Sequence, residues 1–246
     1  MSSLFDKKAV IFDLDGTLID SMESWSRVVI LLTKKIAQKS IPSGWDAATF
    51  RGQILAKYSG CEDAYEAYYA ALAEFLGTKM SVAEIRQMRR EISSKIVTRN
   101  VRFQPGAVDL LRFLKKSGCK LALATMSGKQ KLLDYCHTNN HISQEISLLE
   151  TFDVVLTRND VNCPKPNPEI YLKVLDHLKI SSKEALVVED SLCGVDAAVA
   201  AGIDTVAVEE KTSAQNLPII RKKVQKVYAC LNDLCADLQH GKSLSG

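Results

Sequence analysis

Short apolar runs rich in β-branched residues alternate with helical patterns along most of the 246-residue chain. This alternation is typical of a parallel α/β sheet. The continuous apolar character of the runs fits strands that helices cover on both faces. The predicted strands are Ala9–Phe12, Lys120–Ala124, Asp153–Leu156, Ala185–Val188, Thr205–Val208 and, with the weakest pattern, Lys226–Tyr228.

Turn and capping residues mark the ends of the helices between these strands. Pro105 and Gly106 open one helix, and Asn167 and Pro168 open another as N-cap and first helical residue. An alanine-rich helix then stops at Gly202, a favourable residue for ending a helix.

The segment from Ser21 to Asn100 breaks the alternation, because it carries helical patterns alone. Apolar and aromatic side chains recur in it at helical spacing, which is more often a packed core than a cofactor site. We therefore expect two domains: an α/β core formed by residues 1–20 and 100–246, and an inserted helical domain formed by residues 21–99. Hinges are expected near residues 19–21 and 99–104.

Composition and charge exclude several classes of protein. The net charge of +3 is too small to indicate a nucleic-acid-binding protein or one that binds an acidic membrane surface. The sequence shows neither a secretory signal nor an apolar run long enough to span a bilayer. Seven cysteines without a CxxC pair favour a reducing compartment, so a cytoplasmic protein is expected.

Candidate catalytic residues follow the first predicted strand. Ligands of open α/β sheets bind at the carboxyl ends of the strands, and here the sequence reads Asp13-Leu14-Asp15-Gly16-Thr17. Two carboxylates so close together on an apolar segment need a cation or a proton. Asp13 is placed to attack phosphorus as a nucleophile, and Asp15 to serve as general acid and then general base.

Two further strand ends carry groups that suit a phosphate. Thr125 and Met126 follow the second strand, where hydroxyl and backbone N–H donors can face an anion. The same pattern is also typical of an ordinary Ser/Thr N-cap of the following helix. Lys165 lies between two prolines that restrict the backbone, so its ammonium group is a candidate phosphate clamp.

Two adjacent carboxylates, Glu189 and Asp190, follow the fourth strand. Carboxylates at a buried strand end are expected to hold a hard cation, and Mg²⁺ needs one or two of them together with phosphate and water. The chain thus places a nucleophile, an acid/base, a hydroxyl, a lysine and a metal carboxylate on consecutive strand ends.

These motifs closely resemble those of the haloacid dehalogenase (HAD) superfamily, in the branch with a helical cap inserted after the first motif. Asp13-Leu14-Asp15-Gly16-Thr17 is similar to the first motif, Thr125 to the second, Lys165 to the third, and Glu189-Asp190 to the fourth. The resemblance extends over nearly the whole chain, but the specific motifs lie in the core. It is strongest toward phosphatases and β-phosphoglucomutase-like members.

The resemblance implies a Rossmann-like core with strand order 5-4-1-2-3 and a helical cap. It also implies Mg²⁺ held by the Asp13 and Asp190 side chains and the Asp15 carbonyl. Glu189 would support these ligands from outside the metal's coordination sphere or would be an occasional ligand. Thr125 and Lys165 would hold the transferring phosphoryl group. Backbone N–H groups near Leu14, Asp15 and Met126 would complete the cradle.

The chain departs from the family pattern at several points. Met126 stands where small or amide residues are common, and residues 18–23 lack the Asp-Ser-Glu-Pro form and the following histidine of many relatives. In the expected cap, Arg51 falls roughly where relatives place a substrate-contacting loop. It is a candidate contact for a second phosphate or a carboxylate, or else an exposed arginine near a turn.

Asp15 decides between chemistries within the superfamily. Dehalogenases and phosphonatases do not keep an aspartate at this position, so phosphoryl transfer is favoured. We expect a Mg²⁺-dependent phosphatase for a small phosphorylated metabolite, acting through an aspartyl-phosphate intermediate. A β-phosphoglucomutase-like mutase and a catalytically silent binding relative remain as alternatives. The oligomeric state is open, and a monomer is compatible with the sequence.

Overall fold

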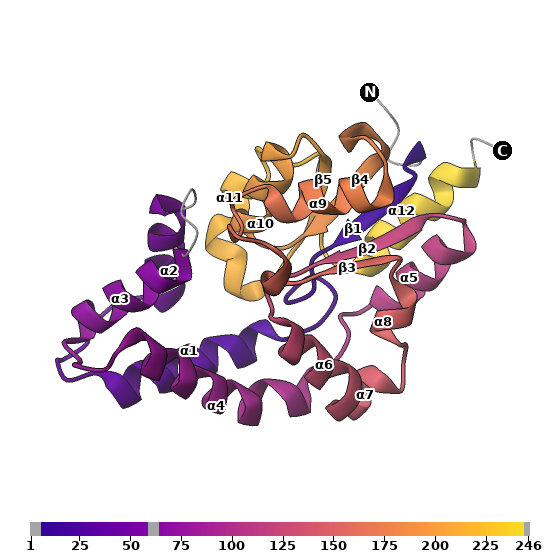
Figure 1. The fold of residues 1–246 in the computed structure, drawn as a ribbon. Helices are drawn as coiled ribbons and strands as arrows, with labels where there is room; N and C mark the ends of the chain where they lie inside the picture. Colours follow the sequence, from indigo (N-terminus) through magenta and orange to yellow (C-terminus); the bar gives the residue numbers. More distant parts are fainter. Residues whose placement is uncertain (1–5, 59–63, 244–246) are drawn as a thin grey trace.

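The computed structural model describes residues 6–58 and 64–243 (Figure 1). Its centre is a six-stranded parallel sheet with the order β3-β2-β1-β4-β5-β6. This confirms the expected order 5-4-1-2-3, with one more strand at the β5 edge. The strands agree with the predicted ranges to within one residue: β1 (Ala9–Phe12), β2 (Lys120–Ala124), β3 (Val154–Leu156), β4 (Ala185–Glu189), β5 (Asp204–Val208) and β6 (Lys226–Tyr228).

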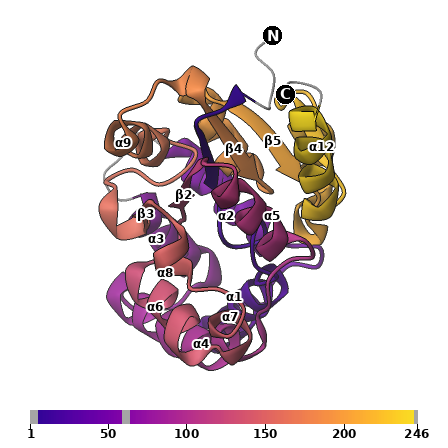
Figure 2. The same ribbon diagram turned by 90° about the vertical axis from the view of Figure 1, so that its right-hand side faces the viewer.

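Helices cover both faces of the sheet, which explains why its strands are apolar throughout. Successive strand side chains point to opposite faces, so Phe12 of β1 packs in one apolar cluster and Ile11 in the other. The first cluster is closed by α5 (Ala107–Lys116) and α12 (Leu231–Ser243), and the second by α9 (Glu169–Leu178) and α10 (Leu192–Ala200). Figure 2 shows the sheet between these layers.

The helix boundaries largely follow the predicted punctuation. Gly106 precedes α5 with a positive φ of 86°, a conformation that favours glycine. The prediction was wrong by one residue at α9, which begins at Glu169 rather than Pro168. The side chain of Asn167 accepts the backbone N–H of Glu169, so it still satisfies a free donor of the first turn.

Further helices fill the connections around the sheet. They are α6 (Lys129–Thr138), α7 (Asn140–Ser143) and α8 (Leu148–Thr151) between β2 and β3, and α11 (Leu217–Ile220) before β6. A 3₁₀ turn at Lys211–Asn216 follows β5 and lies near the carboxyl edge of the sheet.

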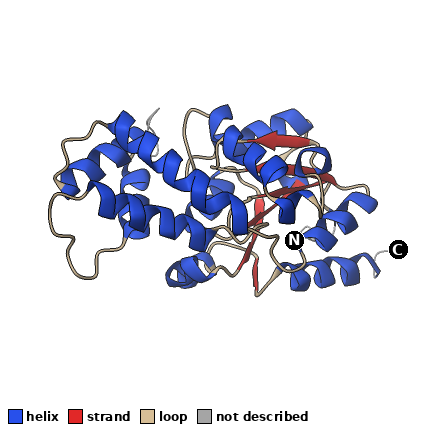
Figure 3. Cartoon of the chain, turned by 90° about the horizontal axis from the view of Figure 1, so that it is seen from below, coloured by secondary structure: helices blue, strands red, loops and turns tan. Residues whose placement is uncertain are grey.

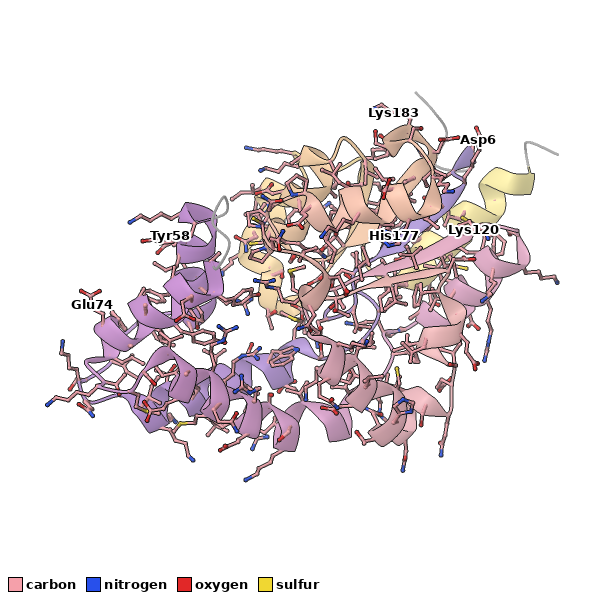
Figure 4. All side chains as sticks on the ribbon, viewed as in Figure 1. Asp6, Tyr58, Glu74, Lys120, His177 and Lys183 are labelled. Carbon is pink, nitrogen blue, oxygen red and sulfur yellow. The ribbon has the colours of Figure 1, made fainter. Side chains whose placement is uncertain are left out.

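In the described part of the chain, four helices between β1 and α5 form the insertion: α1 (Met22–Ile36), α2 (Ala47–Lys57), α3 (Ala64–Leu76) and α4 (Val82–Asn100). Figures 1 and 3 show them extending away from the sheet as a helical layer. Figure 4 places Tyr58 and Glu74 of this layer at the opposite end of the molecule from Asp6 and Lys183. Most of the apolar and aromatic stripe on α3 belongs to the core of this layer: Tyr68, Tyr69, Leu72 and Leu76 are buried, whereas Tyr65 is half-buried and lines the cavity described below.

The insertion leaves and rejoins the core at one point. The backbone N–H of Asp20 donates to the carbonyl of Arg102 at 2.9 Å, and Gln104 donates to Leu18 at 2.8 Å. Ile19 also forms an antiparallel bridge with Phe103. The two segments predicted to be hinges therefore lie side by side.

Two expectations concern the whole chain. No helix in the described ranges is long and apolar enough to cross a bilayer. Six cysteines in these ranges are free thiols, and the seventh, Cys61, lies outside the described residues.

Candidate active site

The carboxyl ends of β1, β2 and β4 open into a cavity of about 480 Å³ between the sheet and the inserted helices. Parallel strands place the residues that follow them at one edge, which is why segments far apart in sequence meet here. The cavity is lined by Asp13, Asp15, Thr125, Met126, Lys165 and Asp190 from the core. Arg51 of α2 and Arg89 of α4 line it from the insertion.

Lys165 lies at the centre of a buried charge cluster. Its Nζ donates to Asp13 Oδ1 and to Glu189 Oε1, both at 2.7 Å, and to the carbonyl of Ala124 at 3.0 Å. The Lys165 side chain is 4% exposed, so these are short charge-assisted bonds in a dry environment. The ring of Tyr171 lies 4.9 Å from Nζ and adds a cation–π contact.

Burial and the charge of Lys165 have opposite effects on the pKa values of Asp13 and Glu189. Burial raises the pKa of Asp13 to about 7, although Lys165 opposes this shift. Burial acts in the same direction on Glu189, but Lys165 and backbone donors outweigh it, and the pKa of Glu189 lies below its usual value. The pKa of Lys165 is well above its usual value, because the two carboxylates outweigh its own burial. The cluster therefore holds one fixed anion, Glu189, and one cation, Lys165.

Glu189 orients its neighbours. Oε1 accepts from Lys165 and from the hydroxyl of Tyr171, and Oε2 accepts from Asp190 N, Ser191 N and Ser191 Oγ. These five bonds occupy its acceptor sites. Gly194, in the first turn of α10, makes room for this carboxylate: a Cβ there would lie 1.7 Å from Oε1.

Asp190 has an oxygen that suits a cation. Oδ1 accepts the hydroxyl of Thr17 at 2.9 Å, whereas the buried Oδ2 has no hydrogen-bond partner among the described residues. A Cβ at Gly16 would lie 2.4 Å from Oδ2, so this oxygen faces the loop that carries Asp13 and Asp15. Burial, with the charges of Glu189 and Asp13, raises the pKa of Asp190 well above its usual value. A buried carboxylate oxygen without a donor is costly unless a cation or proton accompanies it.

The donor set therefore fits a hard divalent cation. Oxygen atoms of Asp13, Asp190 and the loop between Asp13 and Gly16 are the ligand type that Mg²⁺ takes. Within residues 6–58 and 64–243 no group of three His, Cys, Asp or Glu side chains is placed to hold a metal. The expected set, two carboxylates and one backbone carbonyl, does not need such a group, and Glu189 is already engaged by other donors.

Thr125 and Ser127 form the turn after β2. Thr125 Oγ1 accepts the backbone N–H of Ser127 at 3.0 Å, which leaves the hydroxyl proton of Thr125 free to donate. Met126 lies between them and lines the cavity. Thr125 therefore gives the cavity a free donor for phosphoryl oxygens, whereas the three N–H groups of Lys165 are bonded to Asp13, Glu189 and Ala124.

Asp15 is held by four hydrogen-bond donors. Ser21 Oγ, Trp25 Nε1 and Tyr135 OH donate to its Oδ1 at 2.6, 2.8 and 3.1 Å. Ser127 Oγ donates to its Oδ2 at 2.6 Å. The carboxylate is thus tied to α1, to α6 and to the turn after β2 at the same time.

The cavity also contains two guanidinium groups from the insertion. Arg51 and Arg89 have no ion pair or hydrogen bond with the described residues, and both line the cavity. Arg89 Cζ lies 4.6 Å above the ring of Trp25. An anionic group that reaches this side of the cavity would meet two positive charges.

Sequence reasoning missed several of these residues. Thr17 stands in a motif that was already singled out, so its contact with Asp190 could have been found from the motif. Trp25 and Tyr135 lie 10 and 120 positions from Asp15, and neither carried such a signal, because each also fits an ordinary helix. Neutral polar residues of the 3₁₀ turn after β5 also line the cavity, among them Ser213 and Asn216.

Comparison with known proteins identifies the family. The sequence model described as hydrolase, haloacid dehalogenase-like hydrolase, matches residues 7–202. The chain belongs to the haloacid dehalogenase-like hydrolase family. The resemblance inferred from the strand-end motifs is confirmed, as is the prediction of an enzyme.

Individual HAD-like relatives extend over most of the chain. The putative phosphatase YhcW of Bacillus subtilis (strain 168) is 32% identical over 206 residues, which cover 84% of this chain and 85% of the relative. A phosphorylated carbohydrates phosphatase of Thermotoga maritima is 29% identical over 203 residues, covering 81% and 83% of the two chains.

A solved structure supports the same fold. CbbY from Rhodobacter sphaeroides, crystallised with xylulose 1,5-bisphosphate, superimposes with a TM-score of 0.69 at 22% identity and covers 92% of this chain and 95% of its own. The Rossmann-like α/β architecture expected for this HAD-like hydrolase is therefore confirmed.

Proposed function

We propose that this HAD-like hydrolase is a Mg²⁺-dependent phosphatase that hydrolyses a small phosphorylated metabolite, of the sugar phosphate type, through a phosphorylated Asp13. The observation that carries the proposal is the joint placement of Asp13, Lys165, Thr125 and the unpartnered Asp190 oxygen in one cavity with Asp15. The names of the Bacillus and Thermotoga relatives support the same class of reaction.

In the first half-reaction, a carboxylate oxygen of Asp13 forms a bond to phosphorus as the bond from phosphorus to the ester oxygen breaks. The proton of Asp15 passes to the departing oxygen, which leaves as an alcohol. Thr125 donates to the phosphoryl oxygens, where the negative charge is spread in the transition state, and Lys165 does so with the N–H that it releases from Asp13 Oδ1.

In the second half-reaction, water attacks the phosphorus of the acyl phosphate. Asp15, now a carboxylate, takes a proton from this water as the new bond forms, and the Asp13 carboxylate leaves. Inorganic phosphate is released and both aspartates return to their starting states.

Asp13, Asp190 and the backbone carbonyl of Asp15 are the groups that would hold Mg²⁺. The bound ion lowers the repulsion between the Asp13 carboxylate and the phosphate dianion. Glu189 would not itself bind Mg²⁺ but would hold the neighbouring residues in place, since it already accepts hydrogen bonds from Lys165 and Ser191.

We assign substrate recognition to the inserted helices, as a cap formed by residues 21–99 over a core formed by residues 1–20 and 100–246. Arg51 and Arg89 favour a substrate with a second anionic group, such as a bisphosphate or a phosphorylated acid. The neutral polar side chains of the 3₁₀ turn after β5 suit sugar hydroxyls. Closure of the cap about residues 19–21 and 99–104 would exclude bulk water.

The test is phosphate release from p-nitrophenyl phosphate and from a panel of sugar monophosphates and bisphosphates, with Mg²⁺ and with EDTA. We expect Mg²⁺-dependent release, reduced at least about a thousandfold in Asp13→Asn, because this change removes the nucleophile. Asp176→Asn is the matched control, since Asp176 lies exposed on α9. Lack of release from every ester by the folded, Mg²⁺-binding protein contradicts the proposal. Conversion of β-glucose 1-phosphate without phosphate release would indicate a mutase instead.

A further inference from the structure

The two oxygens of Asp15 have different surroundings. Oδ1 accepts three hydrogen bonds, from Ser21, Trp25 and Tyr135, whereas Oδ2 accepts one, from Ser127. Ser21 and Tyr135 are fully buried, and neither is among the described residues that line the cavity. Trp25 and Ser127 do line it. The two oxygens therefore differ in the number of their donors, and each has one donor on the cavity wall.

The acceptor sites of a carboxylate decide where a proton can be placed. Each oxygen offers about two lone-pair sites, so three donors already exceed the capacity of Oδ1. A proton on Oδ1 would need the Ser21 or Tyr135 hydroxyl to turn and accept it, while the Trp25 N–H, which can only donate, would still point at the same oxygen. A proton on Oδ2 needs only a turn of the Ser127 hydroxyl, which can both donate and accept.

We propose that Trp25 and Tyr135 are positioning residues that hold Oδ1 of Asp15, so that Oδ2 alone carries the proton to the leaving group. This inference rests on the proposed phosphatase function. In the step concerned, the Oδ2–H bond breaks and the proton passes to the ester oxygen as that oxygen separates from phosphorus.

Trp25 ties this proton donor to the inserted helices. Its indole donates to Asp15 from the first turn of α1, and Arg89 of α4 lies over its ring at 4.6 Å. Tyr135 donates from α6, which belongs to the sheet connections rather than the insertion. The orientation of Asp15 thus depends on contacts from both parts of the chain.

Leaving-group dependence separates this role from a structural one. p-Nitrophenolate leaves phosphorus without a proton, whereas phenolate is a poorer leaving group that gains from general acid catalysis. The two esters share the phosphoryl group and the aromatic ring and differ by the para nitro group, so each variant is compared with the wild type on the same ester. The ratio kcat/KM reports the steps up to departure of the leaving group and omits hydrolysis of the acyl phosphate, which both esters share.

The experiment measures kcat/KM on p-nitrophenyl and phenyl phosphate for the wild type, Trp25→Phe and Tyr135→Phe, all with Mg²⁺. Each substitution removes one donor and keeps an aromatic ring. Trp45→Phe is the matched control: Trp45 stacks on Phe75 in the insertion, and its Nε1–H has no hydrogen-bond partner among the described residues.

We expect kcat/KM on phenyl phosphate to fall about tenfold in each variant, the effect of losing one hydrogen bond to a charged group. On p-nitrophenyl phosphate it should change less than about twofold, and Trp45→Phe should leave both values unchanged. An equal fall on both esters, or no fall, in Tyr135→Phe overturns the inference even if Trp25→Phe does not fold. Release of phosphate from no ester of the full panel by the folded wild type overturns the proposed function and the inference with it.

Discussion

Replacing Lys165 by methionine would leave two buried carboxylates without their cation. Asp13 is 7% exposed and Glu189 is fully buried, and Lys165 Nζ lies 2.7 Å from an oxygen of each. Methionine fills a similar volume but carries no charge. Removing one partner of a buried ion pair typically costs about 3–5 kcal/mol, and we expect a loss of about 4 kcal/mol in the free energy of unfolding at pH 8.

The loss should depend on pH. Without Lys165, the folded-state pKa of both carboxyls rises, because the neighbouring positive charge that lowers it is gone. A group whose folded pKa exceeds its unfolded value of about 4 destabilises the fold as pH rises from that value through the folded pKa. The penalty should therefore be small near pH 4.5 and largest above pH 7.

Urea unfolding of the metal-free protein at pH 5 and pH 8 measures this dependence. Lys223→Met is the control, since Lys223 pairs with Asp196 on the surface, where such pairs contribute at most about 1 kcal/mol. A Lys165→Met penalty below about 1 kcal/mol at pH 8, or an equal penalty at both pH values, would refute the account of the charge cluster.

Two further outcomes test the cation site and the packing beside it. Mg²⁺ should raise the melting temperature more at pH 8 than at pH 5.5, because protons compete for Asp13 and Asp190, whose pKa values are raised. Asp190→Asn should abolish most of this rise in melting temperature. An equal rise in that variant would rule out Asp190 as a ligand. Gly194→Ala should destabilise the fold by about 2–3 kcal/mol, because the added Cβ would displace Glu189. Gly52→Ala in α2 is the control: a Cβ at Gly52 has nothing within 4 Å, so this change should stabilise the fold slightly. If Gly194→Ala leaves the free energy of unfolding in urea unchanged, the packing argument is contradicted.

The sheet was predictable from sequence because its strands are covered on both faces. Such strands read as continuous apolar runs, and all six lie within one residue of the predicted ranges. The residues at the strand ends could be expected to meet for the same reason, since parallel strands bring them to one edge. Asp13, Thr125, Lys165 and Asp190 indeed lie around one cavity, although their catalytic roles stay predictions.

Contacts made across the insertion could not be predicted in this way. Tyr135 is 120 positions from Asp15, and its hydrogen bond depends on how α6 packs beneath α4. Nothing in the local pattern of α6 distinguishes Tyr135 from an ordinary core tyrosine. Arg51 could be named from its place in the chain, but whether it faces the cavity depends on how α2 packs against α1 and α3.

The meeting of the two ends of the insertion bears on how the central strands find each other. β1 pairs with β2 in the register Ala9 to Lys120, so the chain must close a loop that contains the whole insertion. Asp20 and Arg102 are 82 positions apart yet hydrogen-bonded, so once α1–α4 have folded the loop reduces to residues 13–20 and 102–119, a crossover that contains α5. This is about a quarter of its full length. With about 0.6 kcal/mol for each doubling of loop length, prior folding of the insertion would lower the entropic cost of β1–β2 pairing by roughly 1 kcal/mol. For the sheet, the residues of the insertion would then add almost nothing to the length of the β1–β2 crossover.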